Sequence, residues 1–233
     1  MNVLVVGNGH MGTVVYKELI ERGDSVTIVP DLNRGAEGNF DVLIDFSHPD
    51  GIESIVTFSK KNQVPAVIAT TGYTDEQFEL INELSRAVPV LYSGNYSLGV
   101  ILMERLVREA AQVLGTDFDI EIIEKHHHHK IDAPSGTAKM LLNAANEQLD
   151  YTVIYGREGK CIREEKEIAV HTIRGGSIVG EHEVLFAGAD EILSIKHEAL
   201  SKTIFAKGAI KGGEWLMGKD TGLYKMEDVL FGE

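Results

Sequence analysis

Val3-Leu4-Val5-Val6-Gly7-Asn8-Gly9-His10-Met11-Gly12 is an apolar run followed directly by three glycines. The apolar run predicts a buried strand, and the apolar spacing from Met11 to Arg22 predicts a helix. Glycines spaced G-x-G-x-x-G between a strand and a helix are typical of a Rossmann unit that binds a dinucleotide. The first permits a tight turn, the second lets the backbone approach a pyrophosphate at the helix N-terminus, and the third allows close packing of helix on strand. Glycines that serve only a tight turn are the alternative.

The segments that follow this loop alternate short β-branched runs with longer stretches of helical period. Such alternation indicates an α/β fold with a Rossmann-like parallel sheet. Strands are predicted at residues 3–6, 25–29, 40–46, 66–69 and 89–92, and helices at residues 11–22, 51–61 and 75–87.

Asp31 directly follows the second predicted strand. A carboxylate at this position bonds the ribose hydroxyls of NAD and repels the ribose phosphate of NADP. Arg34 lies close enough in the sequence to bind that phosphate instead. The choice between NADH and NADPH therefore stays open.

Two small-residue segments follow the fourth and fifth predicted strands. Open parallel sheets bind ligands at the carboxyl ends of their strands, so these segments are candidates for contact with the nicotinamide. Ordinary turn chemistry is the alternative interpretation. The complete set of predicted cofactor-binding residues is Gly7, Asn8, Gly9, His10, Met11, Gly12, Asp31, Ala69, Thr70, Thr71, Ser93, Gly94, Asn95 and Tyr96.

The rhythm of the sequence changes after Ser97, which predicts a second domain of a different kind. Strands separated by glycine-containing turns indicate an antiparallel or mixed sheet in an α+β domain. The residues from Lys202 to Met217 and on to Leu230 return to helical period and are expected to pack on the first domain. We therefore divide the chain into a dinucleotide-binding domain, residues 1–97 with 211–233, and a second domain, residues 98–210. Helices are predicted in the second part at residues 98–114 and 135–148, and strands at 119–124, 151–155, 168–174, 177–187 and 191–197.

The most informative segment runs from Glu124 to Thr137 and contains four adjacent histidines. An expression tag is excluded because the run is internal. A metal site is disfavoured, because consecutive residues on an extended segment point to opposite sides and no Cys or H-E-x-x-H pattern completes a ligand set. No metal is therefore predicted. A solvated, charged loop remains an alternative to a catalytic segment.

The catalytic interpretation of this segment depends on a cationic loop beside the start of a helix. Pro134 and Ser135 are typical of a helix N-terminus, whose first amides would face a bound carboxylate. His126 and Lys130 would supply the proton and the positive charge that hydride transfer to an electron-poor carbon requires.

Composition and charge exclude several classes of partner. The 233 residues have a formal net charge of −14, which disfavours binding to nucleic acid or to an anionic membrane surface. No apolar stretch approaches the roughly 20 residues that span a bilayer. The single cysteine, Cys161, cannot form an intramolecular disulfide, and no leader-like segment is recognised, so a cytoplasmic location is expected.

Taken together, these motifs resemble the dihydrodipicolinate reductase family, also called the 4-hydroxy-tetrahydrodipicolinate reductase family, over almost the whole chain. The most specific of them is the H-H-x-x-K-x-D-A-P-S-G-T string that begins at His126. The matching segments are Gly7 to Gly12, Asp41 to Ser47, Ala69 to Gly72, Asn95 to Gly99, Glu124 to Thr137, Arg174 to His182 and Gly218 to Tyr224.

The resemblance implies an enzyme of lysine and diaminopimelate biosynthesis that reduces a cyclic dicarboxylate with NADH or NADPH and releases water. It implies that His126 donates or accepts a proton, that Lys130 donates one, and that His127, Gly136 and Thr137 bind a substrate carboxylate. It also implies a Rossmann domain completed by the C-terminal end of the chain, and a homotetramer formed through the mixed-sheet domain that binds the substrate.

The chain also departs from fuller members of the family. Residues 33–39 replace a longer excursion near Asp31, so the resemblance implies NADH or NADPH without a choice between them. His128 and His129 have no role beyond local positive charge. Two alternatives remain: another Rossmann reductase of a small anionic substrate, and a non-catalytic module that senses NAD(P) or binds metal.

Overall fold

The structure, a computed structural model, describes residues 1–232 and divides into two compact units. Unit 1 comprises Met1–Leu98 together with the residues from Lys202 onward, and unit 2 comprises Gly99–Ser201. The chain thus returns to the first unit at Lys202, whereas the sequence places this return at residue 211. Among residues 1–232, no helix has the length and apolar content needed to cross a membrane.

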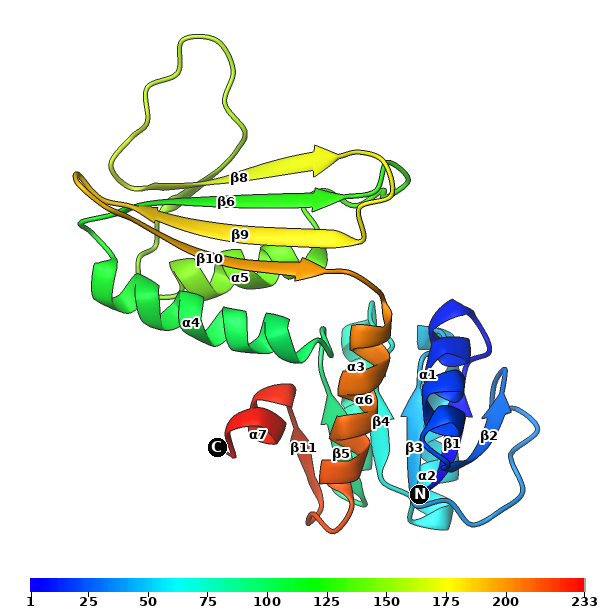
Figure 1. Cartoon of the computed structure of the whole chain (residues 1–233). Coiled ribbons are helices and arrows are strands. Elements are labelled where there is room, and N and C mark those ends of the chain that lie inside the picture. The colour runs from blue at the N-terminus through cyan, green and yellow to red at the C-terminus, as the bar shows by residue number, and fades with distance from the viewer. Residues whose placement is uncertain (233) are drawn as a thin grey trace. The chain divides into compact units, whose positions relative to one another are not determined.

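Unit 1 is built on a six-stranded sheet whose paired strands are all parallel. This arrangement confirms the predicted Rossmann-like sheet (Figure 1). The sheet has the order β11-β5-β4-β3-β1-β2. Its strands are β1 (Asn2–Val6), β2 (Ser25–Val29), β3 (Val42–Asp45), β4 (Ala66–Ile68), β5 (Pro89–Tyr92) and β11 (Gly222–Tyr224).

The prediction of helical structure through to Leu230 was wrong at β11. Three residues are too few to show the alternation of a strand, so the sequence carries no local signal here. The strand forms because Leu223 pairs with Val90 at the free edge of β5. The ring of Tyr224 also packs edge-on against the ring of Trp215, with 5.1 Å between the ring centroids. Pairing with a distant strand therefore decides the structure of this segment.

Helices cover both faces of this sheet. Helices α1 and α6 lie on one face, and α2 and α3 pack together on the other (Figure 1). The packing of α6 is close because its glycines permit it: a Cβ on Gly208 would lie 1.6 Å from the Tyr96 carbonyl oxygen. The helical segments of this unit are α1 (His10–Glu21), η1 (Pro49–Gly51), α2 (Ile52–Asn62), α3 (Asp75–Ser85), α6 (Thr203–Leu216) and α7 (Met226–Phe231).

Unit 2 contains a five-stranded mixed sheet, as the sequence predicts. Strand β6 (Asp119–His126) lies at its centre, antiparallel to β9 (Gly180–Ala187) and parallel to β8 (Glu167–Arg174). The order is β10-β9-β6-β8-β7, where β7 is Thr152–Tyr155 and β10 is Ile192–Ala199.

One face of the mixed sheet carries the core of unit 2. Helices α4 (Leu98–Leu114) and α5 (Gly136–Asn146) contribute apolar side chains to this core, together with alternate residues of the strands. Alternation along β6 leaves Ile120, Ile122, Glu124 and His126 buried. The face opposite the helices therefore presents the intervening side chains of each strand.

Candidate active site

The glycine loop of unit 1 has the geometry that a bound pyrophosphate requires. Gly7 has a φ of +101°, and a Cβ there would lie 2.3 Å from the Phe46 carbonyl oxygen. A Cβ on Gly12 would lie 1.7 Å from the carbonyl oxygen of Gly7, so α1 and the loop pack in direct contact. At Gly9 a Cβ would meet no atom within 4 Å. The loop is thus closed toward the protein and open at Gly9, which fits a dinucleotide.

The residues around this loop leave the start of α1 accessible. Gly9 is the N-cap residue, and no side chain accepts a hydrogen bond at the cap. Asn8 and His10 are exposed, and Met11 is half-buried. The amides at this helix start, with the positive end of the helix dipole, therefore suit an anionic group.

Asp31 is exposed just beyond the end of β2. Its Oδ1 atom accepts a hydrogen bond from the Asn33 amide at 2.9 Å, which orients the carboxylate through a local turn. Arg34 is also exposed. Both candidate contacts to a ribose therefore lie on the surface of the same short segment.

The predicted cofactor residues that follow β4 and β5 divide into two groups. Ala69, Thr71, Ser93 and Gly94 are at least partly exposed, whereas Thr70, Asn95 and Tyr96 are buried. The Tyr96 hydroxyl lies 2.8 Å from the carbonyl oxygen of Ile68. The side chain of Tyr96 is only 3% exposed, so in unit 1 it holds the strand ends together.

Asp45 is a buried carboxyl group at the end of β3 that sequence reasoning did not select. It accepts hydrogen bonds from the Ser47 amide at 3.0 Å and from the Ser47 hydroxyl at 2.5 Å. Burial raises the pKa of Asp45, against these hydrogen bonds. An acidic residue within an otherwise apolar buried strand is the signal that would have identified it. Its contacts order the segment whose backbone lies against Gly7.

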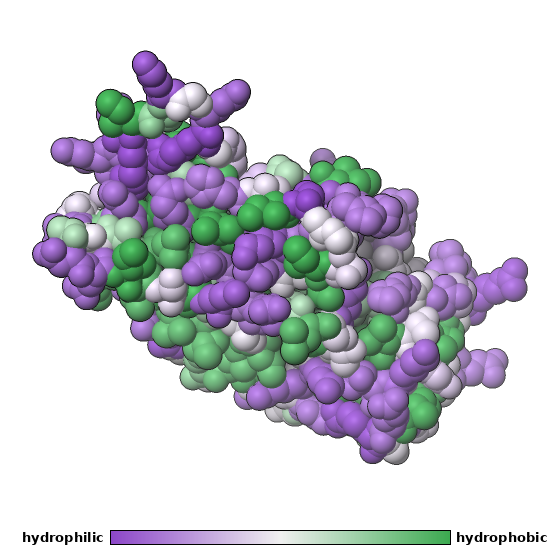
Figure 2. All heavy atoms as spheres, turned by 45° about the horizontal axis from the view of Figure 1, so that its top comes forward, coloured by the Kyte–Doolittle hydropathy of each residue, from purple (hydrophilic) through white to green (hydrophobic). Residues whose placement is uncertain are grey.

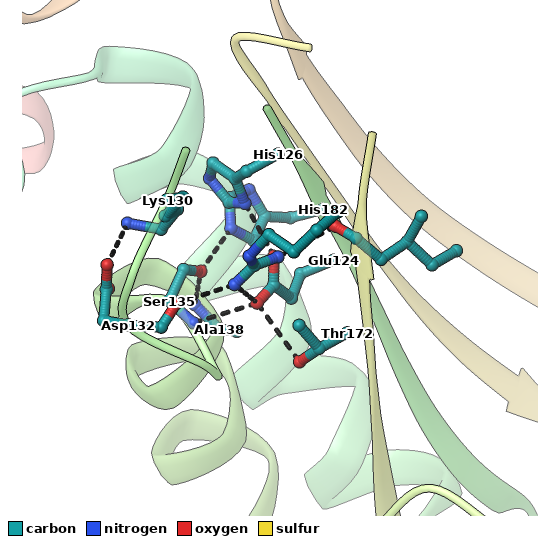
Figure 3. Close-up of polar contacts among 10 residues, drawn as sticks. Glu124, His126, Lys130, Asp132, Ser135, Ala138, Thr172 and His182 are labelled. Atoms are coloured by element: carbon teal, nitrogen blue, oxygen red, sulfur yellow. Dashed lines mark hydrogen bonds and ion pairs between the residues drawn. The ribbon is translucent and has the colours of Figure 1, made fainter. Parts of the chain in front are cut away.

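A polar cluster in unit 2 surrounds the side chain of Glu124, which is 0% exposed (Figure 3). Its Oε2 atom lies 2.6 Å from Nδ1 of His126, and its Oε1 atom accepts a hydrogen bond from the Ser135 amide at 3.0 Å. Arg174 donates to both carboxylate oxygens, each at 2.8 Å. Thr172 Oγ1 also donates to Oε1, at 3.2 Å. We refer to Glu124, His126, Ser135, Thr172, Arg174 and His182 as the Glu124 cluster.

The electrostatics of the Glu124 cluster keep its carboxylate charged. Burial alone would raise the pKa of Glu124, but hydrogen bonds from Arg174, His126 and the Ser135 amide lower it to about 2. Burial lowers the pKa of His126, and the attraction of Glu124 opposes this effect. Burial also lowers the pKa of His182 to about 4. At neutral pH the cluster therefore combines an anionic carboxylate with two neutral imidazoles.

Helix α5 begins at this cluster, as the Pro134-Ser135 pair predicts. The Ser135 hydroxyl caps the helix by accepting a hydrogen bond from the Ala138 amide at 3.1 Å, and it lies 2.9 Å from Nε2 of His182. Gly136 is exposed, and a Cβ there would meet no atom within 4 Å. Thr137 is half-buried. The first turn of α5 therefore borders open space beside the buried carboxylate.

Lys130 lies beside the same helix start (Figure 3). Its ammonium group forms an ion pair with Asp132 at 2.7 Å, and its positive charge contributes to lowering the pKa of His126. His127 is half-buried. The exposed rings of His128 and His129 have their Nε2 atoms 2.7 Å apart. Within residues 1–232, no group of three or more His, Cys, Asp or Glu side chains is arranged to hold a metal ion.

Four members of the Glu124 cluster were not selected from the sequence: Glu124, Thr172, Arg174 and His182. The predicted strand 119–124 ends too early, since β6 continues to His126. With this boundary corrected, the two-residue period of a strand places Glu124 and His126 on the same face. The partners on β8 and β9 depend on strand pairing, which no local pattern reveals.

Comparison with known proteins identifies the family. The family model described as "Dihydrodipicolinate reductase, C-terminus" matches residues 99–230, and the N-terminus model of the same family matches residues 23–96. The chain belongs to the dihydrodipicolinate reductase family. Among curated members, a 4-hydroxy-tetrahydrodipicolinate reductase of Clostridium novyi is 50% identical over 194 residues, covering 82% of this chain and 77% of that protein. One from Brachyspira hyodysenteriae is 44% identical over 232 residues, covering 99% and 100%.

A solved structure of the family shares the fold. The dipicolinate-bound dihydrodipicolinate reductase from Paenisporosarcina sp. TG-14 aligns with a TM-score of 0.78 at 21% identity, covering 99% of this chain and 100% of that one. Aspartate dehydrogenase from Thermotoga maritima aligns with a TM-score of 0.50 at 14% identity, covering 94% and 98%. The fold of this chain is therefore shared with that member of the family and, at a lower TM-score, with this dehydrogenase.

Proposed function

We propose that this member of the family reduces 4-hydroxy-tetrahydrodipicolinate to tetrahydrodipicolinate in lysine and diaminopimelate biosynthesis. The observation that carries the proposal is the 44% identity to a reductase of that name over 99% of the chain. The reaction adds a hydride and a proton to the substrate and releases one molecule of water. Bound NADH or NADPH supplies the hydride, and the open glycine loop of unit 1 suits the pyrophosphate of either.

The side chains of unit 2 suit the transfer of the proton. His126 is neutral at pH 7 and is held by Glu124 through Nδ1, so Nε2 is the nitrogen that exchanges a proton with the substrate or with water. Lys130 carries positive charge beside it and serves as proton donor. His127 and the amides of Gly136 and Thr137 bind a substrate carboxylate at the positive end of α5.

The open face of the mixed sheet supports a homotetramer assembled through unit 2. Ile173 on β8 is 44% exposed on the face opposite α4 and α5. Figure 2 shows hydrophobic residues interspersed with hydrophilic ones on the face that it presents. Burial of Ile173 and its apolar neighbours against a second copy would stabilise an oligomer. The cytoplasmic location likewise stays a prediction.

A coupled assay tests the proposed reaction. The synthase that makes the unstable substrate is supplied with pyruvate and aspartate semialdehyde, and oxidation of NADH or NADPH is followed by absorbance. We expect oxidation that depends on both precursors and that pyridine-2,6-dicarboxylate inhibits in competition with the substrate. A Rossmann reductase that acts on another anion would not be inhibited by pyridine-2,6-dicarboxylate. A non-catalytic sensor would bind NADH without oxidising it. Either result would refute the proposal.

Fluorescence titration with the two reduced cofactors tests the use of each. We expect NADH and NADPH both to bind, since Asp31 and Arg34 are both exposed at the end of β2. The titration is carried out at fixed ionic strength, because the charge of the ribose phosphate makes its binding sensitive to salt. Binding of neither would contradict the cofactor assignment.

A further inference from the structure

We propose that Glu124 is a positioning residue that acts through two groups at once. Its buried carboxylate sets the proton arrangement of the His126 ring, and it also anchors the start of α5 where the substrate carboxylate binds. The proposal rests on the proposed function for its catalytic meaning. The two structural links, however, can be measured without turnover.

The first link fixes the tautomer of His126. An ionised carboxylate can only accept hydrogen bonds, so the contact of 2.6 Å between Glu124 Oε2 and His126 Nδ1 requires that Nδ1 carries the proton. In the neutral ring the lone pair then lies on Nε2. The environment leaves room there because residue 180 is glycine: a Cβ at Gly180 would lie only 3.1 Å from Nε2. The Glu124 carboxylate thus determines that Nε2 is the nitrogen of His126 that can accept a proton.

The second link joins the same carboxylate to the substrate-binding end of α5. Glu124 Oε1 accepts a hydrogen bond from the amide of Ser135, and Ser135 is the residue that caps the helix. Arg174 holds both oxygens of Glu124 and also donates to the carbonyl oxygen of Asp132 at 2.7 Å. The segment that carries Lys130 is therefore fixed at both ends, at His126 and at Ser135.

The charges that surround His126 show why the carboxylate also matters for proton transfer. The ring faces Glu124 from its own strand, Arg174 from β8, the ring of His182 from β9 at 5.1 Å, and Lys130 from the following loop. Lys130 and Arg174 lower the pKa of His126, whereas Glu124 raises it. Removal of the negative charge would therefore leave an imidazole among cations, and the ring would bind a proton less readily.

The deciding experiment compares the full-length protein with Glu124→Gln. Glutamine has the same size but no charge, and its amide group would face the donors of Arg174 and Ser135. We expect the pKa of His126 to fall by about one to three units, measured by NMR titration of the imidazole. The spectrum of His126→Gln identifies the signal among the nine histidines. Glu124→Asp keeps the negative charge, so the pKa of His126 is expected to fall less in this variant than in Glu124→Gln.

The matched control is Glu167→Gln. Glu167 is also a buried carboxylate of unit 2 with an arginine partner, Arg157 at 2.5 Å, but it belongs to a different ion pair. In Glu124→Gln we expect kcat to fall on the order of 100-fold, with a shifted pH profile and weaker binding of pyridine-2,6-dicarboxylate. In Glu167→Gln we expect all three to stay as in the wild type.

Several outcomes would overturn the proposal. Nitrogen chemical shifts of the wild-type protein that place the neutral proton on Nε2 would exclude the first link, and this measurement needs no variant. An unchanged pKa of His126 in Glu124→Gln, or equal losses in Glu167→Gln, would show that Glu124 is merely structural. A wild type that shows the expected tautomer but no reductase activity would refute the proposed function and leave the structural links in place.

Discussion

The imidazole of His126 is held on one side by Glu124 and faces the ring of His182 on another. Glutamine at this position cannot exchange the proton that Nε2 of His126 transfers. His126→Gln is therefore expected to lower kcat by about 10²- to 10⁴-fold. Lys130→Ala is expected to lower kcat by a similar factor. Steady-state kinetics measure the losses, and circular dichroism checks the fold. His129→Gln, which changes an exposed ring, is the control. A mild loss in either of the first two variants contradicts the assigned roles.

The lowered pKa of Glu124 has a consequence for stability in acid. Its folded value of about 2 lies below its ordinary value of 4.5, so the carboxylate stabilises the fold above pH 4.5 and loses this effect as the pH falls toward 2. The shift corresponds to on the order of 3 kcal/mol. Glu124→Gln is expected to unfold more easily at neutral pH and to show a flatter pH dependence in this range. Urea unfolding at a series of pH values measures both, and parallel curves for the two proteins would contradict the prediction.

The glycine at position 180 keeps a side chain away from His126. In Gly180→Ala the new Cβ would lie 3.1 Å from Nε2, so the ring must shift by a few tenths of an ångström. We expect a lower kcat with a small change in melting temperature, because only a proton-transferring atom is displaced. Gly175→Ala is the control, since a Cβ there meets no atom within 4 Å. Wild-type kinetics in Gly180→Ala would show that Nε2 tolerates the displacement.

At the scale of the element, two glycines in the loop between β1 and α1 have different roles, one in cofactor binding and one in stability. Gly9→Ala fits the backbone, with φ of −70°, and meets no protein atom, so the melting temperature is expected to stay unchanged. Its methyl group would occupy the approach of the pyrophosphate and weaken NADH binding by about tenfold or more. Fluorescence titration measures this loss. Tight NADH binding by this variant would mean that the cofactor does not contact Gly9.

Gly12→Ala is the contrasting change in the same loop. Its Cβ would lie 1.7 Å from the Gly7 carbonyl oxygen, so the helix must move away from the loop. We expect a loss of about 1–3 kcal/mol in the free energy of unfolding, measured with urea. Unchanged stability would show that α1 can shift without cost.

The elements also show where sequence reasoning succeeds and where it stops. The parallel sheet of unit 1 follows from a repeated local signal, and β2 and β5 have their predicted bounds. The start of α5 follows from the capping preference of Ser135. Arg174 and His182 could not be joined to Glu124, because their approach depends on the pairing of β6 with β8 and β9. Local patterns do not encode that register.

At the scale of the molecule, the proposed tetramer depends on the open face of the mixed sheet. Ile173→Lys places a charge on this face and is expected to dissociate the oligomer, because an unpaired buried ammonium group is costly. Light scattering after size-exclusion chromatography measures the mass. Val113→Lys, on an exposed position of α4 at 82% exposure, is the control. A monomeric wild type, or an unaffected mass in Ile173→Lys, would contradict assembly through this face.

The return of the chain to unit 1 at Lys202 bears on how the protein is synthesised. Strands β1 to β5 leave the ribosome long before α6, whose Gly212 and Gly213 lie against Leu91, Val42 and Ile44. Until α6 is synthesised, that side of the nascent sheet is covered by α1 without α6, whereas unit 2 is already complete in sequence. The second unit can therefore mature first, and the early strands are the part of the newborn polypeptide that most needs protection by chaperones.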